Sequence, residues 1–406
     1  MSRTRMLPDR RRVLAGAAAV LAAPAIGRAQ GGALKVGVIL PRSGIQAGLG
    51  QDCQRGVDIA APILRDMGMP ELAIMNGDTE SSIDIARAHA EKLVSEGAQL
   101  LIGAFDSGQT TAIAQVAEQK GIPLVINIAG ATAITEQGYR FVFRNFPTAP
   151  MILGDAFGNQ KEIFATVGSA PKTVVFMHVN DTYGTAMAKG ISAVMPKFDM
   201  PYTIVEEIAY DPAARDLSVE VAKAKAANAE ALLVVSRLND AMLMTRELVK
   251  QRWTPQAILS MGPGWTEDQY FRTMGKLSDG PISFIPCPDP RKKLTKLLQA
   301  ALAKRDPGML LNGEHIFTFE ALLVAADAYR RAGSTDPKAL AEAIRTTTIT
   351  ENSSIGPGIQ FNAKGQNDKV RDGAVQNRGG GFVLLAPKEA AVAKPEWPMP
   401  SYLNRI

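Results

Sequence analysis

The hydrophobic positions of the chain form short apolar runs that alternate with longer amphipathic stretches, and this alternation occurs in two consecutive series. Such a pattern is typical of repeated βαβ units around a parallel sheet. The first series predicts strands at 35–40, 72–75, 100–103 and 122–126 and helices at 54–64, 83–94 and 110–119. The second predicts strands at 173–178, 203–208, 231–235 and 258–261 and helices at 152–163, 185–194, 217–227 and 241–251.

Because the same order of elements occurs twice, the expected fold class is α/β, with two doubly wound parallel-sheet lobes joined by a hinge. Hinge segments are expected near 145–148 and 281–287. Helices predicted at 292–302, 313–331 and 338–345 are expected to rejoin the first lobe, and the Gly-rich tail at 355–385 to return to the second. The predicted division is 34–147 plus 285–346 for lobe 1 and 148–284 plus 347–406 for lobe 2.

Composition and charge narrow the class of protein. A chain of 406 residues that is 46% hydrophobic can form about two folded units and is neither disordered nor collagen-like. The net charge of +5 lies in residues 1–29, which hold six arginines against one acid, so the remainder is balanced. A neutral body offers no electrostatic footprint for a phosphate backbone, which makes nucleic acid an unexpected partner.

Residues 1–29 predict an export signal. An Arg cluster precedes the apolar run Val13–Ile26, and Gly27-Arg28-Ala29 gives a small-x-small cleavage site. Fourteen residues span about 21 Å as a helix, which is short for a ~30 Å hydrocarbon core. The Arg10-Arg11-Arg12 run resembles a twin-arginine signal, with an ordinary Arg-rich leader as the alternative. Either route predicts a soluble periplasmic protein of a Gram-negative bacterium, which is not itself embedded in a membrane.

The sequence holds two cysteines, Cys53 and Cys287. An oxidising compartment would permit a disulfide between them, but the sequence does not show whether they are close. Two independent buried thiols are the default expectation.

Sequence motifs that mark enzymatic chemistry are missing. There is no G-x-G-x-x-G after the first strand and no P-loop, H-E-x-x-H or G-x-S-x-G motif. The three histidines, His89, His178 and His315, lack partners at ligand spacing, so no metal site is expected. The acidic pairs Glu206-Glu207 and Glu267-Asp268 are expected to be solvated surface. We therefore expect no catalytic residues and no cofactor, and hence not an enzyme.

Two polar loops follow neighbouring strands of the first series. In Phe105–Thr110 a strand gives way to a helix, so Ser107 and the amides after it are placed to hold a carboxylate. The alternative is that Ser107 only caps its helix. The small residues of Ala129–Thr132 leave room beside the same edge, although a plain turn would explain them too.

These stretches carry a resemblance to a known family. The segments KVGVILPRSG, GDTESSIDIARAHAEKL, IGAFDSGQTTAIAQVAEQKGIPLVIN, GAT, GYRFVFRN and NDTYGTAMAKG, in this order, resemble a type I periplasmic binding protein. The similarity is to the branched-chain amino acid (leucine/isoleucine/valine-binding) group that serves ABC importers. It implies two lobes that close over a ligand, with its carboxylate on the loops of Ser107 and Ala129 and with Tyr183 covering it. The expected ligand-binding residues are Leu49, Ser107, Gln109, Thr110, Ala129, Gly130, Thr132, Tyr183, Arg237, Gly264 and Trp265.

Two departures from the family pattern bear on the ligand. Amino-acid binders of this type place an acid after the strand predicted at 258–261, but this chain has no carboxylate there until Glu267. An unpaired buried ammonium is costly, which argues against an α-amino acid. Arg237 is expected either to hold a carboxylate bidentately or to pair with Asp240 or Glu247. Trp265 either stacks on a planar ligand or closes the edge of the lobe, and Leu49 makes one wall aliphatic.

We therefore expect the periplasmic solute-binding component of an ABC importer, which binds a small organic carboxylate, aromatic or branched aliphatic, by hinge closure. The expected partners are this small molecule and a membrane permease, and the protein is expected to be a monomer. The nearest alternative is an amino-acid, amide or urea binder. A ligand-sensing module for a membrane receptor kinase and an exported enzyme are the alternatives from other classes.

Overall fold

A computed structural model describes residues 32–405 of the chain. The export signal predicted at residues 1–29 lies outside these residues. Among the helices that the structure describes, none combines the length and the apolar character needed to cross a bilayer.

The secondary structure follows the alternation that the sequence predicts. The strands are β1 (Leu34–Leu40), β2 (Leu72–Asp78), β3 (Leu100–Gly103), β4 (Leu124–Ile126), β5 (Val142–Arg144), β6 (Thr173–Val179), β7 (Thr203–Tyr210), β8 (Ala231–Val235), β9 (Ile258–Ser260), β10 (Ile282–Ile285), β11 (Thr348–Ile349), β12 (Ile359–Gln360), β13 (Gly373–Arg378) and β14 (Gly381–Ala386). The α-helices are α2 (Ala47–Asp58), α3 (Ala60–Asp66), α4 (Ile83–Ser95), α5 (Ser107–Lys120), α6 (Ala149–Val167), α7 (Thr182–Val194), α8 (Ser218–Ala226), α9 (Leu238–Lys250), α10 (Asp268–Met274), α11 (Lys293–Arg305), α12 (Gly313–Ala332) and α13 (Pro337–Arg345).

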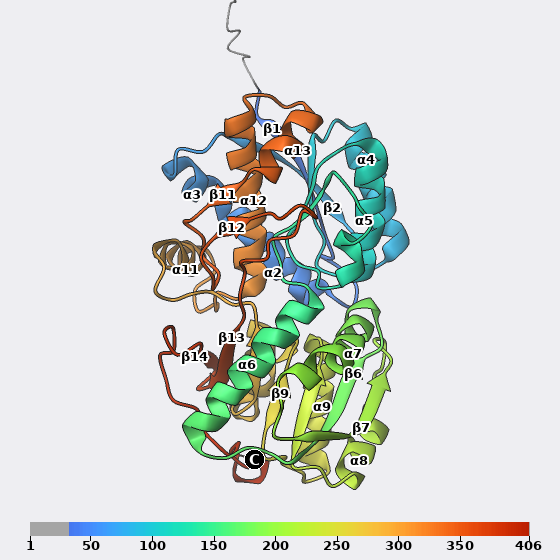
Figure 1. The fold of residues 1–406 in the computed structure, drawn as a ribbon, viewed down its shortest axis with the longest axis vertical. Helices are drawn as coiled ribbons and strands as arrows, with labels where there is room; N and C mark the ends of the chain where they lie inside the picture. The colour runs from blue at the N-terminus through green and yellow to red at the C-terminus, as the bar shows by residue number, and fades with distance from the viewer. Residues whose placement is uncertain (1–31, 406) are drawn as a thin grey trace, which may run out of the picture. The chain divides into compact units, whose positions relative to one another are not determined.

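Two sheets organise residues 33–405 into two lobes (Figure 1). The first lobe contains a parallel sheet in the order β2-β1-β3-β4-β5. The second contains a sheet in the order β14-β13-β10-β9-β8-β6-β7, in which β13 and β14 pair antiparallel at one edge. This arrangement confirms the predicted α/β class with two lobes.

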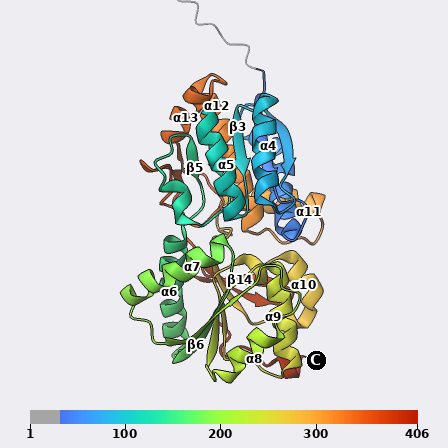
Figure 2. The ribbon, with the colours of Figure 1, turned by 90° about the vertical axis from the view of Figure 1, so that its right-hand side faces the viewer.

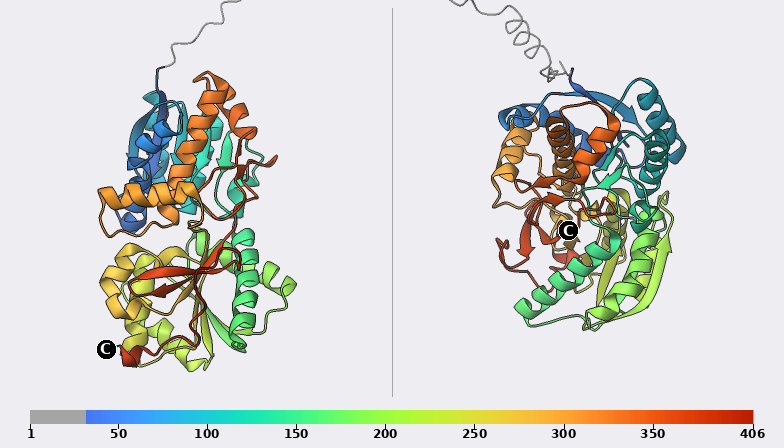
Figure 3. Two further views of the ribbon diagram at one scale, coloured as in Figure 1. Left: turned by 90° about the vertical axis from the view of Figure 1, so that its left-hand side faces the viewer. Right: turned by 45° about the horizontal axis from the view of Figure 1, so that its top comes forward.

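The inner parallel strands of each sheet, such as β3 and β8, are buried on both faces, which explains why they are continuous apolar runs. In the first lobe Val36 and Val38 pack among residues of α2 and α12, while Ile39 of the same strand packs among residues of α4 and α5. Figures 2 and 3 show these two helical layers on either side of the sheet. In the second lobe α6 and α7 cover one face and α8, α9 and α10 the other.

The structure differs from the predicted elements in four places. The helix predicted at 54–64 is two helices that meet at Ile59, because Pro62 lacks the N–H that would bond back to Asp58. Residues 282–285 are strand β10 of the second sheet, so the hinge predicted at 281–287 was placed too early. Helix α10 and strand β5 were not predicted.

The tail also differs from the predicted division between the lobes. Residues 347–367, which we expected in lobe 2, bond to elements of the first lobe. Ser353 N–H donates to Glu320 Oε1 of α12 at 2.8 Å, and Arg144 N–H donates to Gly365 O at 2.7 Å. Only β13 and β14 join the second sheet, so the chain passes between the lobes a third time near 368–372. The remaining domain boundaries stay as predictions.

Candidate functional site

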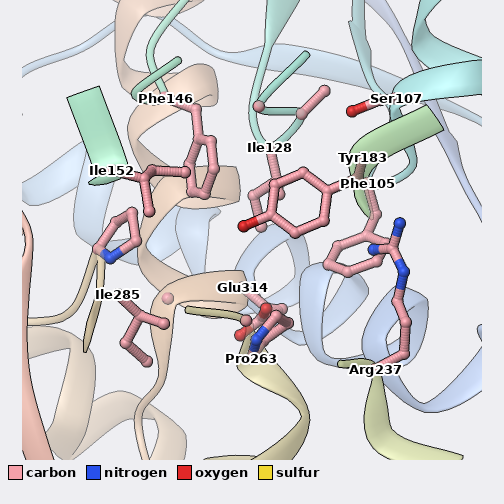
Figure 4. A pocket seen from close by; sticks show the side chains of 15 residues that line it. Phe105, Ser107, Ile128, Phe146, Ile152, Tyr183, Arg237, Pro263, Ile285 and Glu314 are labelled. Carbon is pink, nitrogen blue, oxygen red and sulfur yellow. The ribbon is translucent and has the colours of Figure 1, made fainter. Parts of the chain in front are cut away.

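A pocket lies between the two lobes, and most of its wall comes from loops and helix starts at the carboxyl ends of strands, with further residues from α6 and α12 (Figure 4). This is the edge at which open parallel sheets bind ligands. The lining residues are Phe105, Ser107, Ile128, Ala129, Gly130, Phe146, Ile152, Tyr183, Arg237, Gly262, Pro263, Ile285, Pro286, Gly313 and Glu314. Most of them are apolar, so the few polar side chains decide which groups of a ligand the pocket accepts.

Ser107 lies at the first turn of α5 and joins the two predicted loops. The N–H of Ala131 donates to Ser107 Oγ at 3.3 Å, which leaves the Ser107 hydroxyl hydrogen to point at a ligand oxygen. The amides of Gly108 and Gln109, which we expected to help hold a carboxylate, donate instead to the capping carboxylate of Asp106 at 2.8 and 3.1 Å. The hydroxyl of Ser107 is therefore the main polar group at this end of the pocket.

Arg237 is paired across the cleft. Its Nη2 lies 2.6 Å from Asp181 Oδ2 in its own lobe and 3.2 Å from Asp106 Oδ2 in the other lobe. Burial lowers its pKa, but the charges of Asp181 and Asp106 outweigh burial and hold the pKa above its usual value. The guanidinium also stacks near Phe105 and Tyr183, 5.1 and 5.4 Å from the ring centroids.

This pairing replaces the one that we considered from the sequence. Arg237 makes no ion pair with Asp240 or Glu247 among the described residues; Asp240 accepts the backbone N–H of Arg237 instead. The guanidinium already forms ion pairs with two carboxylates, one from each lobe. Arg237 therefore links the two lobes. A ligand carboxylate would have to compete with these partners.

Tyr183 closes one side of the pocket. Its hydroxyl donates to Met261 O at 2.9 Å, and burial raises the pKa of the phenol. A Cβ added to Gly130 would come within 2.9 Å of Tyr183 Cε2, so only glycine lets the ring lie this close to the loop after β4. Ala129, Gly130 and Tyr183 thus contribute to one wall of the pocket.

Six of the predicted site residues lie outside this pocket wall. Leu49 lies on α2 with its side chain buried in the core, and Thr132 borders a separate surface groove. Gln109 bonds to Thr79 and Gln46, at 2.6 and 2.9 Å, and Thr110 bonds to Asp106 O and the backbone of Ala104. These polar contacts brace the loop behind Ser107.

Gly264 and Trp265 complete this set, and both belong to the core of the second lobe. Trp265 is fully buried and packs edge to face against Tyr270. Of the two roles that the sequence left open, it therefore closes the edge of the lobe and does not stack on a ligand in this pocket. A Cβ on Gly264 would lie 2.2 Å from Arg237 O, closer than any real contact. Gly264 thereby lets the loop after β9 pack against the start of α9.

We expect Gly264→Ala to destabilise the protein by roughly 1–3 kcal/mol, because backbone atoms, which cannot rotate away, surround the added methyl. Urea unfolding of the variant would measure this loss. Gly154→Ala, on α6 of the same lobe, is the control, because its added methyl would meet only Phe198 Cζ at 3.9 Å and should cause no loss of stability. An unchanged unfolding midpoint for Gly264→Ala would contradict the packing described here.

Several lining residues were not predicted. Phe105 and Phe146 follow strands, so the rule about carboxyl ends would have identified them had it been applied to apolar residues as well. Ile152 belongs to α6, Ile285 to β10 and Glu314 to the first turn of α12. No motif or spacing in the sequence marks Glu314.

Glu314 belongs to a buried acidic cluster with Asp52 and Glu267. Asn312 joins two of them, because its Nδ2 donates to Asp52 Oδ2 at 2.9 Å and to Glu267 Oε2 at 3.3 Å. Burial and the charge of Asp52 raise the pKa of Glu314 to about 7, and burial together with Glu314 raises that of Glu267. The expectation that Glu267-Asp268 is solvated surface was wrong, since both side chains are buried.

Both cysteines are free and buried, which confirms the expectation of independent thiols. Burial is the main reason that their pKa values are raised. Among residues 32–405, no group of three or more His, Cys, Asp or Glu side chains is arranged to hold a metal ion.

The chain belongs to the periplasmic binding protein family, whose sequence profile matches residues 33–376. Curated relatives include the Leu/Ile/Val-binding protein homolog 8 of Brucella abortus (strain 2308), which is 24% identical over 375 residues, covering 89% of this chain and 92% of the relative. This chain therefore belongs to the type I, branched-chain amino acid group of the family, as its sequence motifs indicate. The members of this group bind substrates and are not enzymes.

Solved structures share the fold. The leucine-binding protein LivK from Thermotoga maritima superposes with a TM-score of 0.75 at 20% identity and covers 87% of this chain and 98% of its own. A solute-binding protein of an ABC transporter from R. palustris in complex with benzoate gives 0.74 at 20% identity, covering 89% and 100%. LivJ from Streptococcus pneumoniae in complex with isoleucine gives 0.73 at 17%, covering 88% and 100%.

Proposed function

We propose that this protein is the periplasmic substrate-binding component of an ABC importer, and that it binds a small organic acid with an aromatic or branched aliphatic body. The observation that carries the proposal is the pocket itself, in which one hydroxyl, that of Ser107, stands at the end of an apolar chamber between the lobes. Export to the periplasm, delivery to a membrane permease and action as a monomer are parts of this proposal.

The walls favour a flat or branched apolar body. The rings of Phe105, Phe146 and Tyr183 and three isoleucines face the chamber in Figure 4. Rings of this kind stack on a planar ligand and pack on a branched one. Benzoate in one structural neighbour and isoleucine in another are examples of the two shapes in this fold.

The charge of the chamber favours an acid without a charged amino group. The loop after β9 contributes only Gly262 and Pro263 to the wall, so it offers no counter-ion for an ammonium. Glu314 does face the chamber, but its raised pKa of about 7 means that it is partly protonated at neutral pH. An amino acid is the alternative ligand, with Glu314 as its ammonium partner.

A thermal-shift comparison tests the ligand class. We expect phenylacetate and 4-methyl-2-oxopentanoate to stabilise the purified protein and phenylalanine and leucine not to. At a hundredfold excess over Kd, binding contributes about 2.7 kcal/mol, enough to raise the Tm by several degrees. Ser107→Ala should weaken binding of the acids about tenfold or more, because a hydrogen bond to a charged group is lost.

Ser95→Ala, on the exposed end of α4, is the matched control and should bind as the wild type does. Stabilisation by the amino acids and not by the acids would overturn the proposed ligand class and point to Glu314 as the partner of the ammonium. It would leave the assignment as a substrate-binding protein in place.

A further inference from the structure

The acidic cluster described above is contributed by both lobes. Asp52 of α2 and Glu314 of α12 pack with the first sheet, whereas Glu267 lies at the start of α10, next to Trp265 in the core of the second lobe. All three carboxyl groups are buried in the structure. Any opening of the cleft that separates the lobes would therefore take Glu267 away from the other two.

The cluster is short of positive charge. Asp52 is paired with Arg55 at 2.5 Å and accepts one bond from Asn312, so its charge is compensated. Glu267 and Glu314 have no ion-pair partner within residues 32–405, and Glu267 Oε1 is buried without a hydrogen-bond partner. Two buried carboxylates without a cation between them are stable only if they share a proton.

The other charged or titratable groups around the cluster do not supply the missing charge. Burial lowers the pKa of His315 to about 4, so this imidazole is neutral; its Nε2 lies 3.9 Å from Asp52 Oδ1 and has no hydrogen-bond partner. Arg237, which acts on Glu314 from α9, is already paired with two aspartates. The remaining neighbours are a neutral thiol and two further acids, namely Cys53, Asp268 and Asp306.

We propose that closure of the lobes over the ligand takes up a proton into the Glu267–Glu314 pair, and that the ligand group facing Glu314 is uncharged. This inference rests on the proposed function, because Glu314 lines the same pocket. A ligand ammonium would play the part of the proton, so its binding at neutral pH would take up no proton. Whether a proton is taken up on binding therefore reports the charge of the ligand at this wall.

The closed form holds the additional proton, and this decides how the equilibrium between the open and the closed form depends on pH. In the open form Glu267 is away from Glu314 and Asp52 and both glutamates face water, so their pKa values are lower; in the closed form burial raises both, and the charges of Glu314 and Asp52 raise that of Glu267 further. Closure is thus favoured at low pH and weakens as the pH rises toward and past the closed-form pKa, which is about 7 for Glu314. For one proton, Kd rises by up to about tenfold per pH unit within this window.

The first measurement needs no ligand. Small-angle X-ray scattering of the purified protein from pH 5.5 to 8 should show a radius of gyration that increases with pH. In Glu267→Gln, which keeps the shape but not the titration, the radius should stay constant. Glu91→Gln, an exposed position on α4, removes the same charge and should behave as the wild type does.

The second measurement is titration calorimetry with phenylacetate in phosphate and in Tris at pH 7, two buffers that differ in ionisation enthalpy. We expect proton uptake in the wild type and in Glu91→Gln and none in Glu267→Gln. Binding of phenylacetate without proton uptake in the wild type, or a radius that does not change with pH, would overturn the inference. If phenylacetate does not bind, the proposed ligand class fails, while the pH dependence of the wild-type radius still decides the inference.

Discussion

Replacing Arg237 with methionine should weaken ligand binding by about a hundredfold or more while leaving the fold intact. The guanidinium joins Asp181 of its own lobe to Asp106 of the other, and all three side chains are largely buried in the closed form. Removing one member of such a group leaves charges buried without a partner, at a cost of about 3–5 kcal/mol. Water would solvate the two aspartates in an open form, so the cost falls on closure.

Isothermal titration with the ligand identified by thermal shift would measure the change in Kd. Arg246→Met, at an exposed position of the same helix α9, is the matched control and should bind normally. Asp106→Asn separates the two contacts, since asparagine can still cap α5 but no longer pairs with Arg237. An Arg237→Met protein that binds as tightly as the wild type would show that the ion pairs of Arg237 are not needed for closure.

Replacing Arg144 with methionine should destabilise the first lobe by roughly 3–5 kcal/mol. Arg144 is fully buried and bonds only to neutral acceptors: Gln366 Oε1 at 2.6 Å, Ala129 O at 3.0 Å, Ala131 O at 2.7 Å and Thr135 Oγ1 at 2.5 Å. Burial lowers its pKa to about 9. Each acceptor left buried without a donor costs about 1–3 kcal/mol.

The same bonds hold the loop that forms one wall of the pocket, because Ala129 and Gly130 line it. We therefore expect Arg144→Met to lose ligand affinity as well as stability. Urea unfolding measures the first effect and titration calorimetry the second. Arg140→Met, at an exposed position close by in the sequence, is the control. A loss of less than about 1 kcal/mol for Arg144→Met would mean that water or neighbouring donors replace the guanidinium.

The predicted residues that the pocket brings together are those that follow strand ends, and their part in ligand binding stays a prediction. Ser107, Ala129, Gly130, Tyr183 and Arg237 line the pocket because each follows a parallel strand, and all these strands end at the edge facing the other lobe. The predicted residues that lie outside the pocket wall include two whose side chains point another way. Gln109 and Thr110 lie one or two residues from Ser107, but helix α5 turns them toward the interior of their own lobe.

The sequence by itself determined the two series of βα units, because strands buried on both faces are uninterrupted apolar runs and their helices have a recognisable period. Strands β3 and β8 lie where the pattern predicts them. It also determined the family, through the order of its motifs.

Only the tertiary structure decided the partners of the charged groups. Arg237 meets Asp106 across the cleft, although 131 positions separate them in the sequence, and Glu314 joins Asp52 and Glu267 from three different helical segments. The tail at 347–367 also returns to the first lobe because of a buried charge. The carboxylate of Glu320 accepts hydrogen bonds from the backbone N–H groups of Ser353 and Ser354. Burial and charge pairing depend on how distant segments pack, and no local pattern of residues records that packing.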